Sequence, residues 1–222
     1  MNRTRLIPFA ITDIDEEHVC VAGIGEDGTW MRPEPLFRSD IDVNSYFAYG
    51  HATELCVEAS TAVEKRIEDR DFVREKPTTI VQELTPDEVK KIIQQRLDGS
   101  VEEIFASGRS IGFIKPKVLD ITYGRNLGGT KKIRLIFTDQ KDVKYNFIVA
   151  ERKFKGLVLK NLDENGQLDI EKKQKILKLL SETELYFSVG LTRKMTGFLG
   201  PYDGCHALVV GLHAFPYYSP FL

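Results

Sequence analysis

Two stretches at opposite ends of this chain resemble one another, and this repeat constrains the fold more than any other sequence feature. Near the start, an apolar run over 6–12 is followed by a second run over 18–24. Near the end, a run over 185–192 is followed by one over 206–212. In each copy the first run ends in Ile-Thr or Leu-Thr, and the second leads from a His to a Gly between aliphatic residues. The repeat predicts two related β units rather than one large sheet.

Length and charge leave several classes of soluble protein open. A chain of 222 residues forms one large domain or two of about a hundred residues each. Its 31 basic and 33 acidic residues give a formal charge of −2, which argues against an all-basic surface but allows one basic face. We expect neither a membrane span nor a signal peptide, because there is no apolar run of about 18 residues and no basic-then-apolar leader. A cytoplasmic location is therefore expected.

The first half is predicted to consist of strands with one helix. Strands are expected over 5–14, 18–24 and 54–63, with a short strand over 29–32 that Pro33 ends. The segment 37–51 is expected to be a long loop. A helix should begin at Pro86, where Thr85 and Glu88 form a capping box, and end at Asp98-Gly99.

The second half repeats this composition. The segment 107–112 is expected to join the halves, and strands are expected again from Lys117, with an alternating hairpin over 132–149. A second helix is expected over 170–182, capped by Asp169. We therefore predict a mainly β protein with inserted helices, built as two small OB-like antiparallel β-barrels in tandem over 1–108 and 109–222. Two β-sandwiches are the competing architecture, and the inserted helices argue against them.

Three groups of side chains are candidate contacts for nucleic acid. Trp30 and Arg32 place an indole and a guanidinium on one short strand, where they could stack on bases and hold phosphate. A core position is the alternative for Trp30, and a salt bridge is the alternative for Arg32. Arg193 and Lys194 open a Gly-rich segment that also contains Phe198 and Tyr202, and the alternative is a solvated loop whose aromatics pack down. Basic residues alternate along the predicted hairpin, Lys132 and Arg134 among them, and could follow a phosphate backbone or simply be solvated.

Metal and catalytic chemistry have little support. Cys20, Cys56 and Cys205 are far apart in apolar runs and lack the spacing of zinc ligands, so free thiols and no metal are expected. Motifs for nucleophilic catalysis, phosphate loops or dinucleotide binding are missing, and no cofactor is expected. A metal-dependent nuclease would have to draw on the scattered carboxylates Asp13, Asp15, Asp40 and Asp42.

Several short motifs taken together resemble a family. They are Val19–Gly23, Trp30–Pro33, Ser110–Pro116, Val189–Arg193 and Val210–Pro216. In this order they are similar to the conserved segments of bacterial dual OB-domain proteins, a poorly characterised family, and they span most of the chain. The chain departs from that pattern before Cys20, where acidic residues replace a basic stretch. The resemblance implies two OB folds and, by analogy of fold, nucleic-acid binding.

The leading hypothesis is a non-catalytic protein that binds single-stranded nucleic acid through Trp30, Arg32, Lys132, Arg134, Arg193 and Lys194. The second hypothesis is a module that binds a protein partner with the same barrels, and the third is a metal-dependent nuclease or other small enzyme. They differ in what they require of the structure: a basic groove for the first, and converging carboxylates for the third.

Overall fold

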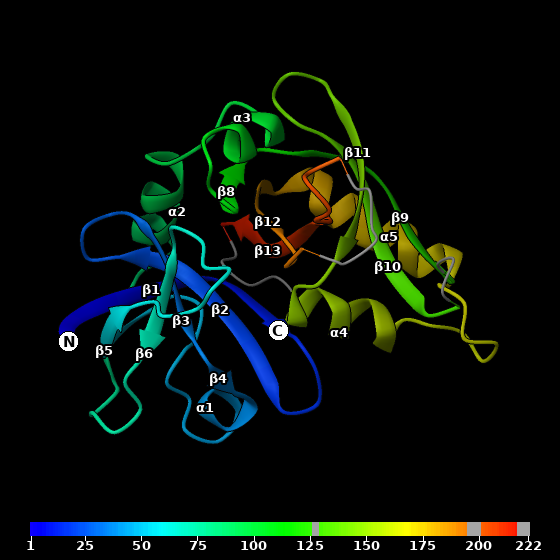
Figure 1. Ribbon diagram of the computed structural model, residues 1–222. Coiled ribbons are helices and arrows are strands. Elements are labelled where there is room, and N and C mark those ends of the chain that lie inside the picture. Colours follow the sequence, from blue (N-terminus) through cyan, green and yellow to red (C-terminus); the bar gives the residue numbers. More distant parts are fainter. Residues whose placement is uncertain (126–128, 195–200, 217–222) are drawn as a thin grey trace.

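The strands form two sheets that divide the chain between them (Figure 1). The structure is a computed structural model that describes residues 1–125, 129–194 and 201–216. All strands of the first sheet lie between residues 2 and 83, and all strands of the second lie between 111 and 215. The expected boundary at 108/109 falls between the two sheets. The protein is mainly β with inserted helices, as predicted.

The first sheet closes into a five-stranded barrel. Around the barrel the order is β1-β2-β3-β6-β5 and back to β1, and β3 and β6 form its parallel pair. Two short strands extend the sheet: β4 pairs with β2, and β7 with β5. The elements of this half are β1 (Asn2–Asp13), β2 (His18–Gly25), β3 (Trp30–Glu34), β4 (Leu36–Phe37), α1 (Arg38–Asp42), β5 (His51–Ala59), β6 (Asp69–Phe72) and β7 (Thr79–Glu83).

The second sheet has the order β8-β12-β13-β11-β10-β9, with β11 and β13 as its parallel pair. Its end strands β8 and β9 are consecutive in the chain and separated only by Lys115 and Pro116. Two helices, α4 and α5, connect β11 to β12. The elements are β8 (Ile111–Ile114), β9 (Lys117–Arg125), β10 (Lys131–Thr138), β11 (Lys144–Val149), α4 (Arg152–Lys160), α5 (Ile170–Glu182), β12 (Glu184–Leu191) and β13 (Ala207–Phe215).

The two sheets share one strand order once β8 and β9 are taken as a single interrupted strand. In the barrel, β1 pairs with β5 through its first half and with β2 through its second half. In the second sheet, β8 pairs with β12, and β9 pairs with β10. Each sheet then runs first, second, third, fifth and fourth strand, with the third and fifth parallel.

The repeat in the sequence does not correspond to this shared order. Its first copy is the hairpin β1–β2, the first two strands of the barrel, whereas its second copy is β12–β13, the last two strands of the second sheet. The expectation that the halves are related by these copies is therefore wrong. The copies look alike because each is a buried antiparallel pair with aliphatic residues in alternation.

In the chain, two helices follow the last strand of the first sheet and precede the second sheet: α2 (Pro86–Gln94) and α3 (Val101–Ala106). The capping box at α2 is as predicted: Glu88 N–H donates to Thr85 Oγ1 over 3.3 Å, and Thr85 N–H donates to Glu88 Oε2 over 2.7 Å. The helix ends three residues earlier than expected. Helix α5 has its predicted range and its cap, with Lys172 N–H donating to Asp169 over 2.9 Å.

Other expectations were wrong in detail. Pro33 does not end β3, because the strand reaches Glu34 and pairs in parallel with β6. The segment expected to be a loop over 37–51 contains α1. Short elements of this kind lack the long periodic pattern on which the sequence argument depends.

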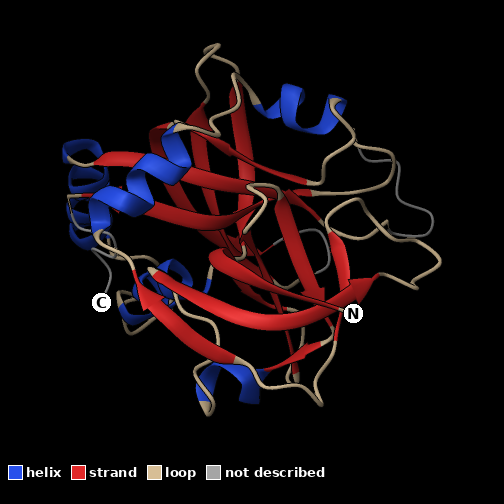
Figure 2. Cartoon of the chain, turned by 90° about the vertical axis from the view of Figure 1, so that its left-hand side faces the viewer, coloured by secondary structure: helices blue, strands red, loops and turns tan. Residues whose placement is uncertain are grey.

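Three apolar clusters hold the molecule together, and one of them joins the sheets. The barrel interior and the interior of the second sheet each have their own cluster. The third, the junction cluster, packs the outward face of β2–β3 (Ala22, Ile24, Trp30) against β8 and β12. Figure 2 shows the strands crossing the middle of the molecule, with helices on its outside.

A close backbone contact adds to the junction. The pairing of β1 with β2 shifts register between Pro8 and Ala10, so Phe9 lies in a bulge. The Phe9 carbonyl approaches Gly211 of β13 so closely that a Cβ at residue 211 would lie 2.0 Å from this oxygen. Only glycine fits there without movement of the backbone. None of the described helices is long and apolar enough to cross a membrane.

Candidate nucleic-acid interface and the junction pocket

Arg32 and Arg193, two of the six expected contacts, belong to a network of charges at the junction. Arg32 is 6% exposed, and its Nη1 lies 3.3 Å from Oδ1 of Asp69. Arg193 Nη1 lies 2.8 Å from the other Asp69 oxygen, and its Nη2 lies 2.6 Å from Glu34. Two guanidinium groups therefore share one buried carboxylate. This use is the salt-bridge alternative to phosphate binding.

Further members of the network come from the segment before β6 and from the start of β8. The Arg32 guanidinium donates to Ser110 Oγ over 2.6 Å, and Ser110 N–H donates to the buried Glu68 carboxylate over 2.6 Å. Arg66 donates to the backbone carbonyls of Leu191 and Thr192. Three arginines (32, 66 and 193) and three carboxylates (34, 68 and 69) thus fasten the barrel to β8 and to the end of β12.

Trp30 is a core residue at the junction. Its side chain is 6% exposed and packs on Phe113 of β8, with ring centroids 4.6 Å apart. Phe9 meets the indole edge to face at 6.5 Å. Trp30 does lie on the outward face of β2–β3, where a base-stacking residue was expected, but the second sheet covers that face. Because the side chain is only 6% exposed, stacking on a base in the manner expected from the sequence would require the junction to open.

Lys132 and Arg134 lie on an open surface. They point outward from β10, while Ile133, Leu135 and Phe137 point into the core of the second sheet. The surface that they share with Thr122 of β9 and Lys144 and Asn146 of β11 is named the β10 face here. No carboxylate among the described residues lies within 4.0 Å of the cationic groups of Lys132, Arg134 or Lys144. Arg134 donates to the Asn146 carbonyl over 3.1 Å.

Lys194 is the remaining expected contact. Its side chain is 55% exposed, and its Nζ lies 2.9 Å from Asp203. Phe198 lies outside the described residues. Tyr202 packs against Phe105 of α3 with ring centroids 4.7 Å apart, as the packed-down alternative expected. The structure therefore brings Arg32 and Arg193 together at the junction, leaves Lys132 and Arg134 together on the β10 face, and separates Lys194 from both.

The carboxylates considered for a nuclease do not converge. Asp13 lies 3.0 Å from Arg152 and 3.4 Å from Lys155, and Asp42 also pairs with Arg152 at 3.0 Å. Asp40 is fully buried against Arg74 at 2.7 Å. Over residues 1–125, 129–194 and 201–216, no group of three or more His, Cys, Asp or Glu side chains could hold a metal ion. Cys20, Cys56 and Cys205 are free thiols.

A buried histidine completes the junction. His213 of β13 is 1% exposed, and its Nε2 lies 3.0 Å from Ser188 Oγ and 3.1 Å from the Phe9 carbonyl oxygen. The Ser188 hydroxyl donates to the same carbonyl over 2.7 Å. Burial lowers the pKa of His213 to about 3, so the ring is neutral at physiological pH. Ser188 is wholly buried, so this pair is not placed to attack a substrate.

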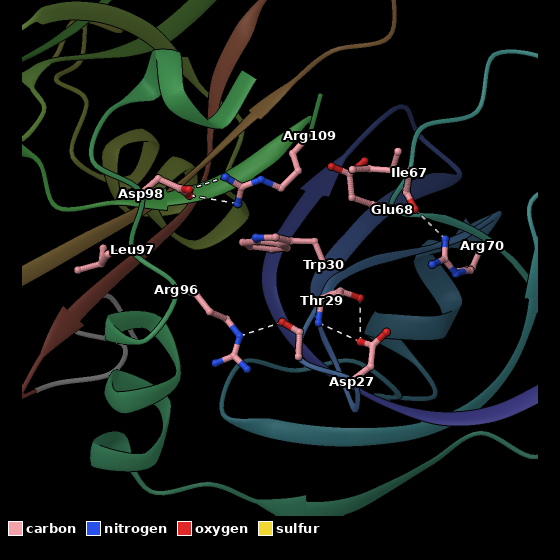
Figure 3. A pocket seen from close by; sticks show the side chains of 11 residues that line it. Asp27, Thr29, Trp30, Ile67, Glu68, Arg70, Arg96, Leu97, Asp98 and Arg109 are labelled. Atoms are coloured by element: carbon pink, nitrogen blue, oxygen red, sulfur yellow. Dashed lines mark hydrogen bonds and ion pairs between the residues drawn. The ribbon is translucent and has the colours of Figure 1, made fainter. Parts of the chain in front are cut away.

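A pocket of about 620 Å³ opens at the edge of the junction (Figure 3). It is called the junction pocket here. Figure 3 shows the Trp30 indole in its middle, with the Asp98–Arg109 ion pair on one side and Arg96 on the other. The lining comes from the β2–β3 turn, the segment before β6, the end of α2 and the start of β8: Asp27, Gly28, Thr29, Trp30, Ile67, Glu68, Arg70, Arg96, Leu97, Asp98 and Arg109.

Reasoning from the sequence found only Trp30 of this pocket. Arg70, Arg96 and Arg109 are isolated in the sequence and follow no motif, so no local pattern marks them. Arg70 lies in β6, Arg96 follows α2 and Arg109 precedes β8, so only the packing of these separate segments brings the three together. A comparison with models of known protein families and with curated proteins finds no match for this chain.

Proposed function

We propose that this chain is a non-catalytic nucleic-acid-binding protein made of two OB-like barrels, and that the β10 face holds the strand. The strand order of the barrel, in which a long first strand pairs with both the second and the fourth, is the order of an OB fold. The second sheet repeats this order and is then a barrel whose first strand is interrupted at Pro116.

The β10 face carries the proposal. OB folds bind oligonucleotides on the face of their second and third strands, which in the second sheet are β10 and β11. That face presents three cationic side chains, Lys132, Arg134 and Lys144, free of carboxylate partners among the described residues. Thr122 and Asn146 are its polar neighbours, and Asp120 on the same face is paired with Lys173 at 2.7 Å, so a phosphate backbone could lie along the three cations.

The corresponding face of the first barrel is not available in the same way. Its second and third strands are β2 and β3, whose outward face forms the junction. Arg32 and Arg193 therefore support the nucleic-acid surface only by holding the halves together, and the proposal moves the contact from them to Lys132, Arg134 and Lys144.

Fluorescence anisotropy with a labelled 5′-hydroxyl oligonucleotide tests the proposal over a series of salt concentrations. The Lys132→Gln/Arg134→Gln variant should bind more weakly and lower the log–log salt slope by about 1.4, since each phosphate contact on a single strand contributes about 0.7. Lys76→Gln/Lys91→Gln is the matched control, because it removes the same charge from exposed positions in the first half. An equal effect of both variants, or no binding by the wild type at low salt, would reject the proposal.

A further inference from the structure

We propose that the junction pocket binds a nucleoside phosphate, a ligand separate from the strand assigned to the β10 face. The pocket is built from the β2–β3 turn, the segment before β6, the end of α2 and Arg109. None of these segments contributes to the β10 face. The inference uses the charges, the unpaired donors and the size of the pocket.

Two of its three arginines have no carboxylate partner among the described residues. Arg109 is engaged with Asp98, its Nη1 lying 3.4 Å from Oδ2 and its Nη2 closer still to Oδ1. Arg96 donates only to backbone carbonyls, from Nε to Gly28 at 3.0 Å and from Nη1 to Ile92 at 3.2 Å. Arg70 Nη1 likewise donates to the carbonyls of Ile67 and Asp69.

Backbone carbonyls hold these two side chains in place without neutralising them. Nη2 of each keeps N–H donors to which the described residues offer no acceptor. None of the three acidic lining residues forms an ion pair with Arg70 or Arg96: Asp98 pairs with Arg109, and Asp27 acts on Arg70 only through space, where it lowers the local positive charge. Glu68 is bound to Ser110, and the Asp27 carboxylate accepts from Thr29 N–H at 2.9 Å and from Thr29 Oγ1 at 2.8 Å. A dianionic phosphate suits such oriented guanidinium groups.

A further donor comes from Trp30. Its Nε1–H is buried and has no hydrogen-bond partner among the described residues, although indole N–H groups in protein interiors usually have one. The side chain lines the pocket with Leu97 and Ile67, which supply apolar surface. A free inorganic phosphate would use neither the apolar walls nor a volume of about 620 Å³. A ligand with an anionic group and a flat heterocycle uses both.

The only Trp of the chain reports on this pocket directly. Intrinsic fluorescence should therefore change saturably when AMP is added to the wild-type protein, and adenosine should bind at least about tenfold more weakly, because it lacks the charge that the arginines meet. Equal affinity for adenosine and AMP, or no saturable response to AMP, would overturn the proposal.

Variants of Arg70 and Arg96 test whether these two side chains bind the phosphate group of AMP. Arg70→Gln/Arg96→Gln should weaken AMP binding by about a hundredfold, the effect of losing two charge-assisted contacts. Lys76→Gln/Lys91→Gln, which removes two positive charges from exposed positions, is the matched control. Unfolding midpoints verify that both variants are folded. If the folded double variant binds AMP within about threefold of the wild type, the arginines do not bind phosphate and the assignment is wrong.

The phosphate could belong to a free nucleotide or to the end of a strand. In the Lys132→Gln/Arg134→Gln background, a 5′-phosphorylated oligonucleotide that still changes Trp30 fluorescence identifies a strand end as a ligand, and a response to AMP alone identifies a free nucleotide. Both results support a phosphate site in the pocket. This background lacks the two main cations of the β10 face, so loss of strand binding there does not affect the response of Trp30 to AMP. A failure of the pocket proposal can therefore be told apart from a failure of the proposed strand-binding surface.

Discussion

The two sheets share a strand order, but the outward face of their second and third strands differs: it is buried in the first sheet and accessible in the second. The outward face of β2–β3 in the barrel is apolar and buried in the junction. The outward face of β10–β11 in the second sheet carries Lys132, Arg134 and Lys144 beside Ile136 and Ile148, and its residues are half-buried or exposed. The difference shows that strand order does not decide which face meets a ligand; the side chains on the outward positions do.

The first strands differ as well. β1 is continuous and bends at a bulge beside Pro8, whereas its counterpart is divided into β8 and β9 at Pro116. Both sheets therefore place a proline near the bend of the first strand. The bulge also frees the Phe9 carbonyl, which accepts hydrogen bonds from Ser188 and His213 of the second sheet.

The largest expected effect comes from closing the approach between the sheets. Gly211→Ala places a Cβ 2.0 Å from the Phe9 carbonyl oxygen, so the backbones must separate and the junction must loosen. We expect a loss of about 3 kcal/mol or more in the free energy of unfolding, measured by denaturant titration. Gly124→Ala is the control within a strand, since its Cβ would meet no atom within 4 Å. If Gly211→Ala and Gly124→Ala lost the same free energy of unfolding, the close approach of the Phe9 carbonyl to Gly211 would not limit the junction.

A smaller effect depends on pH, because the junction buries a neutral histidine. Since burial lowers the pKa of His213 to about 3, the unfolded chain binds a proton below about pH 6.5 that the folded protein does not. Stability should therefore fall as the pH drops below about 6, by up to about 1.4 kcal/mol per pH unit, which amounts to about 2 kcal/mol between pH 6 and pH 4.5. Above about pH 6.5 the histidine is neutral in both the folded and the unfolded protein, so its titration no longer changes the free energy of unfolding.

His213→Gln tests this contribution. The glutamine amide can donate to the Phe9 carbonyl in place of Nε2 but does not titrate in this range. The variant should lose stability less steeply than the wild type between pH 6 and 4.5, as followed by denaturant midpoints. Parallel curves would show that the titration of His213 does not determine the slope.

The sequence predicted the elements with strong local signals. The capping box at Thr85, the cap at Asp169 and the alternation around Leu135 each led to an element that is present. Mainly β structure with inserted helices followed from the same patterns. Strands β6 and β7 were missed because β6 is four residues long and β7 is wholly exposed, so neither shows a clear alternation of buried and exposed residues.

The site was harder to predict for a different reason. Whether Arg32 contacts a ligand or an aspartate depends on Asp69, which is 37 positions away and comes beside it only through the parallel pairing of β3 with β6. The pocket arginines come from β6, from the end of α2 and from the segment before β8, and only the folded chain brings them together. A sequence shows which side chains carry charge, but the partners that neutralise them are set by long-range pairing.

The smallest expected effect separates two neighbours, Arg193 and Lys194, that the sequence treats alike. Arg193 bridges Glu34 and the buried Asp69 at the junction, whereas Lys194 pairs with Asp203, whose side chain is 90% exposed. Arg193→Ala should lower the free energy of unfolding by about 1–2 kcal/mol, because Asp69 loses one of two guanidinium partners while Arg32 still holds the other oxygen. Lys194→Ala should leave the denaturant midpoint unchanged, since exposed pairs contribute little. If both variants unfold at the wild-type midpoint, the junction network adds nothing to stability, and Arg193 becomes available again as a phosphate contact.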